Sequence, residues 1–231
     1  MMRATDAMEY LPDMEAIDSD IMETVLGTAA ELDPSNFTDA DVRRALDGDP
    51  GIEGFAALLS PAAEPHLEEM AARALDETRR HFGNSVCLFT PLYVSNYCSN
   101  ECVYCGFNCR NGIHRATLDL PSVERELDAI AATRLEEVLI LTGESRARSG
   151  VDYISKCVEL ASERFATVGV EVYPMNTDEY AVLHRSGADY VTVFQETYDP
   201  ARYAELHLSG PKRVFSYRFD AQERALRGGM R

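Results

Sequence analysis

The part of the sequence that follows residue 86 alternates short apolar runs with segments that have the periodicity of amphipathic helices. The apolar runs, which are candidate strands, cover residues 86–95, 137–142, 167–173, 190–195 and 214–219. The helical segments cover residues 121–133, 151–165, 177–187 and 200–208, and a last one ends at Gly228. Strands this apolar are buried on both faces, and helical crossovers between them make neighbouring strands parallel. The alternation therefore predicts an α/β fold, either a doubly wound sheet or a (β/α) barrel.

The residues before this region have helical patterns and little that predicts a strand. One helix is predicted over residues 15–32. A second begins near Asp39, because Thr38 and Asp41 have the spacing of a capping box. A third is predicted over residues 64–82, where apolar side chains recur at helical spacing. This part of the sequence predicts a helical layer.

The two patterns divide the sequence into an N-terminal helical extension, residues 1–85, and a partial (β/α) barrel, residues 86–231, of about five βα units. Both candidate architectures place their chemistry at the carboxyl ends of the strands. The polar residues at those ends are the cysteine loop after residue 95, Thr142-Gly143-Glu144, Tyr173, Gln195-Glu196-Thr197-Tyr198 and Arg218. We therefore expect one active site at this edge.

Four of the six cysteines fall within twelve positions, at Cys98, Cys102, Cys105 and Cys109. The first three have the spacing C-x3-C-x2-C on one short loop. Three thiolates on one loop can bind three irons of a cubane cluster and leave the fourth iron open to another ligand. The spacing leaves two alternatives: a structural zinc site of four cysteines, and a four-cysteine electron-transfer cluster that includes Cys109.

The charge of the chain argues against a protein that coats nucleic acid. It has 22 basic and 39 acidic residues, a formal net charge of −17, whereas phosphate contacts need clustered Lys and Arg. No apolar run approaches the roughly 20 residues of a membrane helix, and the first residues do not resemble a secretory signal. We therefore expect a cytoplasmic protein, with neither nucleic acid nor membrane as a partner, in a reducing compartment.

The cysteine loop resembles the signature of radical S-adenosyl-L-methionine (SAM) enzymes. In that superfamily C-x3-C-x-aromatic-C follows the first strand of a (β/α) barrel, and the aromatic residue here is Tyr104. Residues 92–107 resemble more specifically the 2-iminoacetate synthase family, the tyrosine lyases of thiamine biosynthesis. Further segments with the same order and spacing are 113–118, 141–144, 171–174, 179–180 and 194–198. The resemblance runs from about residue 60 to the last residue and implies a partial TIM-type barrel.

The resemblance implies a [4Fe-4S] cluster and SAM as cofactors. Cys98, Cys102 and Cys105 would bind the cluster as its metal ligands, with Cys109 as a bystander, and Tyr104 would flank the adenine. In this family a SAM-derived radical acts on the amine of tyrosine, away from water, and cleavage of the Cα–Cβ bond yields 2-iminoacetate and p-cresol. We therefore expect a radical SAM carbon–carbon lyase, and the sequence identifies no catalytic residue beyond the cofactor ligands.

The remaining SAM contacts are also implied by the resemblance. Thr142, Gly143 and Glu144 would receive the methionyl amine. Glu196 would accept the ribose hydroxyls, since a carboxylate takes two hydrogen bonds at once. Arg218, on the fifth candidate strand, would hold the SAM carboxylate with its bidentate fork.

Each of these charged residues also has a purely structural interpretation. Glu144 can be a charge favoured by the dipole of a following helix, and Arg218 can be a surface residue at a strand end. Glu196 can pair with Arg202 or with another local cation. His207 is predicted to be a surface or capping residue rather than a ligand.

The resemblance implies tyrosine as the substrate, a reduced flavodoxin or ferredoxin as electron donor, and thiazole synthase as a further partner. Three alternatives stay open: the tyrosine lyase of hydrogenase cofactor maturation, a radical SAM enzyme with another substrate, and a non-catalytic metal-binding relative. The family's chains continue well beyond the length of this one, and five βα units leave an open edge. We expect that the chain is truncated or that a partner covers this edge.

Overall fold

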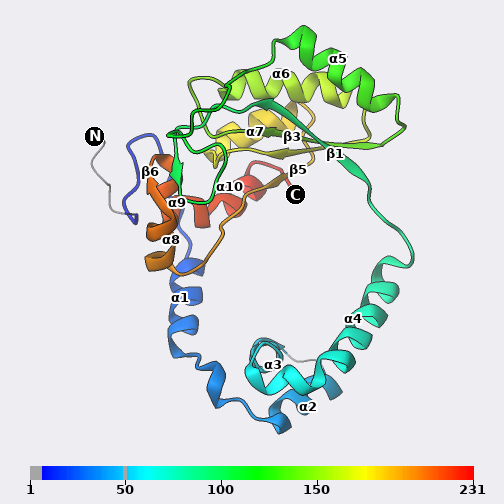
Figure 1. The fold of residues 1–231 in the computed structure, drawn as a ribbon, viewed down its shortest axis with the longest axis vertical. Helices are drawn as coiled ribbons and strands as arrows, with labels where there is room; N and C mark the ends of the chain where they lie inside the picture. Colours follow the sequence, from blue (N-terminus) through cyan, green and yellow to red (C-terminus); the bar gives the residue numbers. More distant parts are fainter. Residues whose placement is uncertain (1–6, 49–50) are drawn as a thin grey trace. The chain divides into compact units, whose positions relative to one another are not determined.

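The computed structural model describes residues 7–48 and 51–231, which form two compact units (Figure 1). The helical unit comprises Glu23–Cys87. The sheet unit comprises Leu88–Arg231 together with the start of the chain up to Met22. The predicted helical extension, residues 1–85, is thus divided, because the described residues before position 23 pack with the sheet.

The helical unit consists of short helices around a small apolar core. Its elements are α1 (Ile21–Glu31), η1 (Pro34–Asn36), α2 (Asp39–Asp47), α3 (Gly51–Leu58), η2 (Pro61–His66) and α4 (Leu67–Phe82). The predicted capping box is confirmed, since the backbone N–H of Thr38 donates to the Asp41 carboxylate over 2.9 Å. The first helix begins six residues later than predicted, at Ile21 instead of residue 15. The core consists of Val42, Leu46, Ala57 and Ala63.

The sheet unit contains the predicted parallel α/β architecture. Its strands are β1 (Phe89–Ser95), β3 (Glu137–Thr142), β4 (Thr167–Glu171) and β5 (Tyr190–Thr192), all parallel in the order β1-β3-β4-β5. The connecting helices are α5 (Leu120–Ala131), α6 (Val151–Ser162) and α7 (Thr177–Arg185). They pack on one face of the sheet through the main core (Figure 1). Among the described residues, no helix is long and apolar enough to cross a bilayer.

The fifth predicted strand, residues 214–219, is wrong, because this apolar run forms the helix α9 (Phe215–Phe219). The Arg218 N–H bonds the Val214 carbonyl at 3.2 Å, a helical contact. Helix α8 (Pro200–Leu206) precedes it and α10 (Ala221–Arg227) follows. A small antiparallel pair that the sequence did not predict joins β2 (Glu101–Cys102) to β6 (His207–Ser209). The parallel sheet therefore has four strands and not five.

Residues 7–18 form an N-terminal strap that is bonded to the last helices of the sheet unit. The Ala7 carbonyl accepts the Phe215 N–H at 2.7 Å, and the Tyr10 hydroxyl donates to Asp220 at 3.0 Å. Glu15 caps α7 by accepting the Thr177 hydroxyl at 3.0 Å. The strap and the helices α7, α9 and α10 thus hold one another in place.

Candidate functional site

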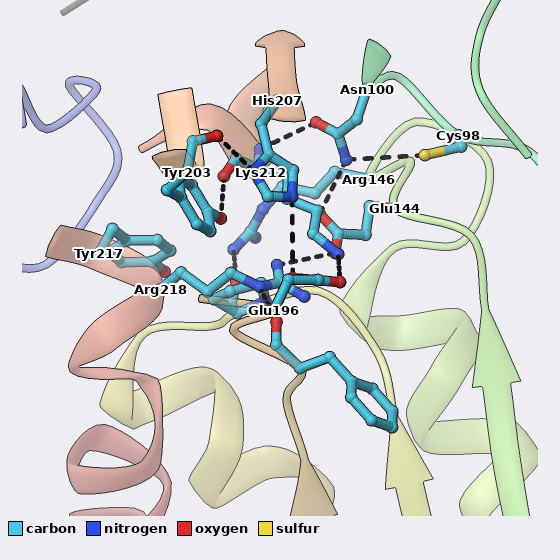
Figure 2. A network of polar contacts seen from close by, with 12 residues as sticks. Cys98, Asn100, Glu144, Arg146, Glu196, Tyr203, His207, Lys212, Tyr217 and Arg218 are labelled. Carbon is cyan, nitrogen blue, oxygen red and sulfur yellow. Dashed lines mark hydrogen bonds and ion pairs between the residues drawn. The ribbon is translucent and has the colours of Figure 1, made fainter. Parts of the chain in front are cut away.

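All residues to which the sequence assigned a cluster or SAM contact line one cavity of the sheet unit. The cavity has a volume of about 210 Å³ and lies at the carboxyl ends of the parallel strands. Its wall includes Cys98, Cys102, Tyr104, Cys105, Thr142, Gly143, Glu144, Glu196 and Arg218. The polar contacts among several of them form one network (Figure 2). The fold therefore gathers the predicted site residues in one place.

The cysteine loop is held by side chains that bond its backbone. Arg115 donates to the carbonyls of Asn96, Phe107 and Asn108 at 2.6, 3.0 and 2.8 Å. The side-chain amide of Asn108 donates to the Cys102 carbonyl at 2.7 Å. Since the backbone polar groups of an irregular loop need partners, these bonds fix the loop without a long regular element.

The three motif thiols line the cavity, whereas Cys109 is exposed and does not line it. Burial raises the pKa of the Cys98 thiol, and it raises that of Cys102 to about 12. Both thiols are therefore protonated at neutral pH in the metal-free chain, and metal binding has to displace their protons. Among the described residues, no three Cys, His, Asp or Glu side chains are close enough to hold one ion. The thiols are thus spread along the cavity wall.

Glu144, which follows β3, forms a buried ion pair with Arg218 on α9. Arg218 Nη1 and Glu144 Oε1 are 2.8 Å apart, and the side chains are 4% and 13% exposed. Arg218 Nε also donates to the Phe194 carbonyl after β5. Burial alone would raise the pKa of Glu144, but the charges of Arg218 and Lys212, with hydrogen bonds from Arg218 and Asn100, lower it below its ordinary value. Glu144 is therefore an ionised acceptor. It is not in the first turn of the following helix, which begins at Val151, and Arg218 does not have the surface position of its structural alternative.

Gly143 is required by the close approach of the cysteine loop to the end of β3. A Cβ atom at Gly143 would lie 2.3 Å from the Tyr97 carbonyl oxygen. The Gly143 N–H donates to the Ser95 carbonyl at 2.8 Å, which fastens β3 to the start of the loop. Beside it, the buried Thr142 hydroxyl has no hydrogen-bond partner among the described residues. A buried polar atom of this kind at a cavity wall is ready to bind a ligand.

His207 does not lie at the surface, because its side chain is fully buried, but the alternative that it is a capping residue is confirmed, since it is the C-cap of α8. Its Nε2 is 2.8 Å from the Tyr104 hydroxyl, and its Nδ1 is 2.8 Å from the Tyr203 carbonyl. Since the carbonyl only accepts, Nδ1 carries the proton and Nε2 accepts from Tyr104. Burial lowers the pKa of His207 and raises that of Tyr104, so both are neutral at pH 7. His207 thus orients the aromatic residue of the motif.

Glu196, after β5, pairs with Lys212, whose Nζ lies 2.8 Å from Glu196 Oε1. The expected neighbour Arg202 instead pairs with Glu205 at 2.6 Å. Glu196 has a left-handed backbone, φ 61°, which is uncommon for a residue other than glycine and often marks functional sites. The structural alternative is thus half right, since Glu196 has a cation partner but not the one that its position in the sequence indicated.

Among the lining residues to which the sequence assigned no role are Asn100, Glu171 and Lys212. Asn100 is fully buried and contacts Cys98, Glu144 and Lys212 (Figure 2). Its position between two motif cysteines was a usable signal. Lys212 offered no local signal, because it lies 112 positions from Asn100.

Residues 92–231 match the profile of the Radical SAM superfamily. The chain is 44% identical over 194 residues to the 2-iminoacetate synthase of Escherichia coli (strain K12), a match that covers 84% of this chain and 52% of that protein. It is 28% identical to the 3-methylornithine synthase of Methanosarcina barkeri (strain Fusaro / DSM 804), over 76% of this chain and 53% of that protein. The chain thus spans about half the length of the curated relatives it matches.

The fold is similar to solved structures of related proteins. It superposes on the crystal structure of HydG, a maturase of the [FeFe]-hydrogenase, with a TM-score of 0.80 and 26% identity, over 93% of this chain and 48% of that one. The likeness extends to TIM-barrel-type enzymes, in agreement with the predicted partial barrel.

Proposed function

Because the chain belongs to the radical SAM superfamily, we propose that it is a lyase that cleaves the Cα–Cβ bond of tyrosine to 2-iminoacetate and p-cresol. The observation that carries the proposal is the single cavity lined by the three motif thiols together with Glu144 and Arg218. The 44% identity to 2-iminoacetate synthase supports this branch of the superfamily, and with it a role in the formation of the thiamine thiazole.

The residues of the cavity fit a [4Fe-4S] cluster with SAM. Three thiols that line one cavity can bind three irons of a cubane cluster. The exposed Cys109 supports a three-cysteine site over a four-cysteine one. The unpartnered Thr142 hydroxyl and the ionised Glu144 provide acceptors for an amine at the opposite wall.

The cluster and SAM would supply one-electron radical chemistry when bound. Cys98, Cys102 and Cys105 would hold the cluster, and Glu144 would accept the SAM amine. Arg218 has five N–H donors, and those that do not bond Glu144 and Phe194 are suited to a carboxylate. These side chains bind and orient the reacting groups and keep water from them.

The second half of the SAM site is formed by Glu196 and Tyr104. Glu196 accepts the ribose hydroxyls, and it has to share its carboxylate with Lys212 or release it. The Tyr104 ring, held by His207, flanks the adenine. Outside the chain, the proposal includes reduced flavodoxin or ferredoxin as electron donor, thiazole synthase as the consumer of 2-iminoacetate, and the cytoplasm as location.

Anaerobic reconstitution with iron and sulfide tests the cofactor part. We expect about four irons per chain and an electron paramagnetic resonance (EPR) spectrum that changes when SAM is added. Cys98→Ser, Cys102→Ser and Cys105→Ser should each lose the cluster, and Cys109→Ser is the matched control that keeps it. One bound zinc ion, or full iron content after all three motif thiols are replaced, would contradict the proposal.

Product analysis tests the reaction. Incubation of the reconstituted chain with SAM, a reductant and tyrosine should yield p-cresol and 5′-deoxyadenosine, and phenylalanine in place of tyrosine is the control substrate. Cleavage of SAM without p-cresol by a version of the protein that spans the full length of its curated relatives would contradict the lyase assignment.

A second candidate is the tyrosine lyase of hydrogenase cofactor maturation, which the TM-score of 0.80 to HydG favours. Both activities release p-cresol, so the second product distinguishes them. Accumulation of 2-iminoacetate supports the thiamine branch, and diatomic products support the hydrogenase branch.

A further inference from the structure

We propose that Asn100 is a positioning residue that couples the cluster ligand Cys98 to Glu144, so that SAM binding and the cluster's reduction potential depend on one side-chain amide. The inference rests on the proposed cofactor site. Asn100 Nδ2 lies 2.8 Å from Glu144 Oε2 and 3.6 Å from Cys98 Sγ, and its Oδ1 lies 2.8 Å from the Lys212 backbone nitrogen. Figure 2 shows Asn100 between these groups.

The orientation of the Asn100 amide is fixed by its partners. The backbone N–H of Lys212 can only donate, so the atom that faces it at 2.8 Å must be the Asn100 oxygen. The amide nitrogen then points toward the Glu144 carboxylate and the Cys98 sulfur, which both accept. The amide nitrogen has two N–H groups, so one is available for the Glu144 carboxylate and one for the Cys98 sulfur.

The position of Asn100 is set by close packing as well as by hydrogen bonds. The residue is fully buried, and its own carbonyl accepts the Cys109 N–H at 2.9 Å. A Cβ atom at Gly210 would lie 2.4 Å from Asn100 Oδ1, and Gly210 has φ 94°, so only glycine lets this turn approach. The amide therefore has little freedom to turn away from Cys98 and Glu144.

The two bonds have different expected consequences. A donor to a cysteine sulfur stabilises the more negative, reduced state of a cluster and so raises its reduction potential. A donor to Glu144 holds the carboxylate in the orientation that receives the SAM amine, and a hydrogen bond to a charged group is among the stronger ones. Loss of the amide should thus both lower the reduction potential of the cluster and weaken the binding of SAM.

Asn100→Asp tests the inference with almost no change of shape. It keeps the oxygen that accepts the Lys212 N–H, and it replaces the shared donor with an acceptor. At an applied potential equal to the wild-type midpoint, we expect the ratio of reduced to oxidised cluster to fall about tenfold. This fall corresponds to a midpoint potential that is about 59 mV lower, for a one-electron couple. SAM affinity, measured from the EPR change on titration, should fall at least about tenfold.

Asn84→Asp is the matched control, because it introduces the same charge at an exposed position away from the cysteine loop. Asn84 follows α4 and belongs to the helical unit. We expect the control's ratio of reduced to oxidised cluster at that applied potential, and its SAM affinity, to stay within about twofold of the wild-type values. Iron content verifies that each variant loads its cluster, and Asn100→Ser, which adds no charge, replaces Asn100→Asp if the latter loads poorly.

A double variant separates the two arms. If Asn100 acts on SAM through Glu144, then Asn100→Asp should not weaken SAM binding further in a Glu144→Gln background, whereas its shift in potential should persist. Wild-type chain that loads no cluster or ignores SAM would overturn the proposed function. Wild-type chain that does both, with Asn100→Asp indistinguishable from Asn84→Asp, would overturn this inference alone.

Discussion

Two carboxylate–cation pairs border the candidate site, and they differ in how firmly they are held. Glu144 and Arg218 are 13% and 4% exposed, and each has a further partner, Asn100 for the carboxylate and the Phe194 carbonyl for the guanidinium. We call these groups the fixed wall. Glu196 and Lys212 are 22% and 12% exposed. With His207, whose Nε2 is 3.7 Å from Glu196, they form the exchangeable wall.

The difference follows from the chemistry of the two cations. The Arg218 guanidinium is also held by a carbonyl. If it moved away from the buried carboxylate, the carboxylate would remain as an uncompensated buried charge, which is unfavourable. An ammonium is a compact charge on a flexible stem, so it can move aside when another donor arrives. A ligand can therefore compete for Glu196 more easily than it can displace Arg218 from Glu144.

The largest effect is expected from Arg218→Met, which leaves the Glu144 carboxylate buried without its cation. Breaking a buried pair in this way costs about 3–5 kcal/mol of unfolding free energy. Urea denaturation measures it, with Lys212→Met as the comparison in the other wall. Equal losses in the two variants would remove the distinction between the walls.

Gly143→Ala should have the next largest effect, because the added methyl would collide with the Tyr97 carbonyl at 2.3 Å. We expect a loss of about 1–3 kcal/mol from the forced backbone shift, together with weaker SAM binding as Glu144 moves. Gly106→Ala is the control, since a Cβ there meets nothing within 4 Å. If both variants unfold at the same urea concentration, the close contact between Gly143 and the Tyr97 carbonyl does not contribute to stability.

Lys212→Gln should cost about 1 kcal/mol, the range of a partly exposed ion pair. Arg202→Gln should change the unfolding free energy by less than about 0.5 kcal/mol, because Arg202 pairs with Glu205 on the surface. The same urea series compares them. If Arg202→Gln lost more unfolding free energy than Lys212→Gln, Arg202 rather than Lys212 would be the cation partner of Glu196.

The smallest effect concerns acidification. Burial lowers the pKa of His207 below its ordinary 6.5, so the unfolded chain takes up this proton at a higher pH than the folded chain. Stability should therefore begin to fall as pH drops below about 6.5, with a slope from this residue of at most about 1.4 kcal/mol per pH unit. The pKa of Glu144 is lowered below 4.5, so the fixed wall keeps its contribution until the pH falls further, through that lowered pKa.

Unfolding free energies between pH 7.5 and 5.0 measure this difference. His207→Gln should flatten the profile, and His81→Gln, at an exposed position in the helical unit, should leave it unchanged. A His207→Gln profile as steep as that of wild type would place the acid sensitivity outside the exchangeable wall.

Periodicity predicted the four parallel strands, because each is an apolar run followed by a helix of clear 3.6-residue spacing. It failed at residues 214–219, since a short apolar run does not distinguish a strand from a buried helix. The N–H of Phe215 bonds Ala7, a residue that no local pattern connects with it. The cluster motif was predictable because its spacing is local, and Arg218 was assigned to the correct cavity on the wrong element.

The rest of the site depends on long-range contacts. Lys212 meets Asn100 across 112 positions, and His207 meets Tyr104 across 103. Neither residue lies in a motif, and the direction of each side chain is decided by how β6 and the 3-10 turn after it, Pro211–Arg213, fold back on the cysteine loop. A sequence pattern can place a residue on an element, but it cannot orient a side chain between elements this far apart.

The N-terminal strap imposes an order of events on synthesis. Residues 7–18 are synthesised well before their partners, since Thr177 lies 162 positions after Glu15 and Asp220 lies 210 positions after Tyr10. The helical unit, Glu23–Cys87, is complete long before. The strap therefore has to wait, without its final contacts, until the polypeptide has been made at least as far as Asp220.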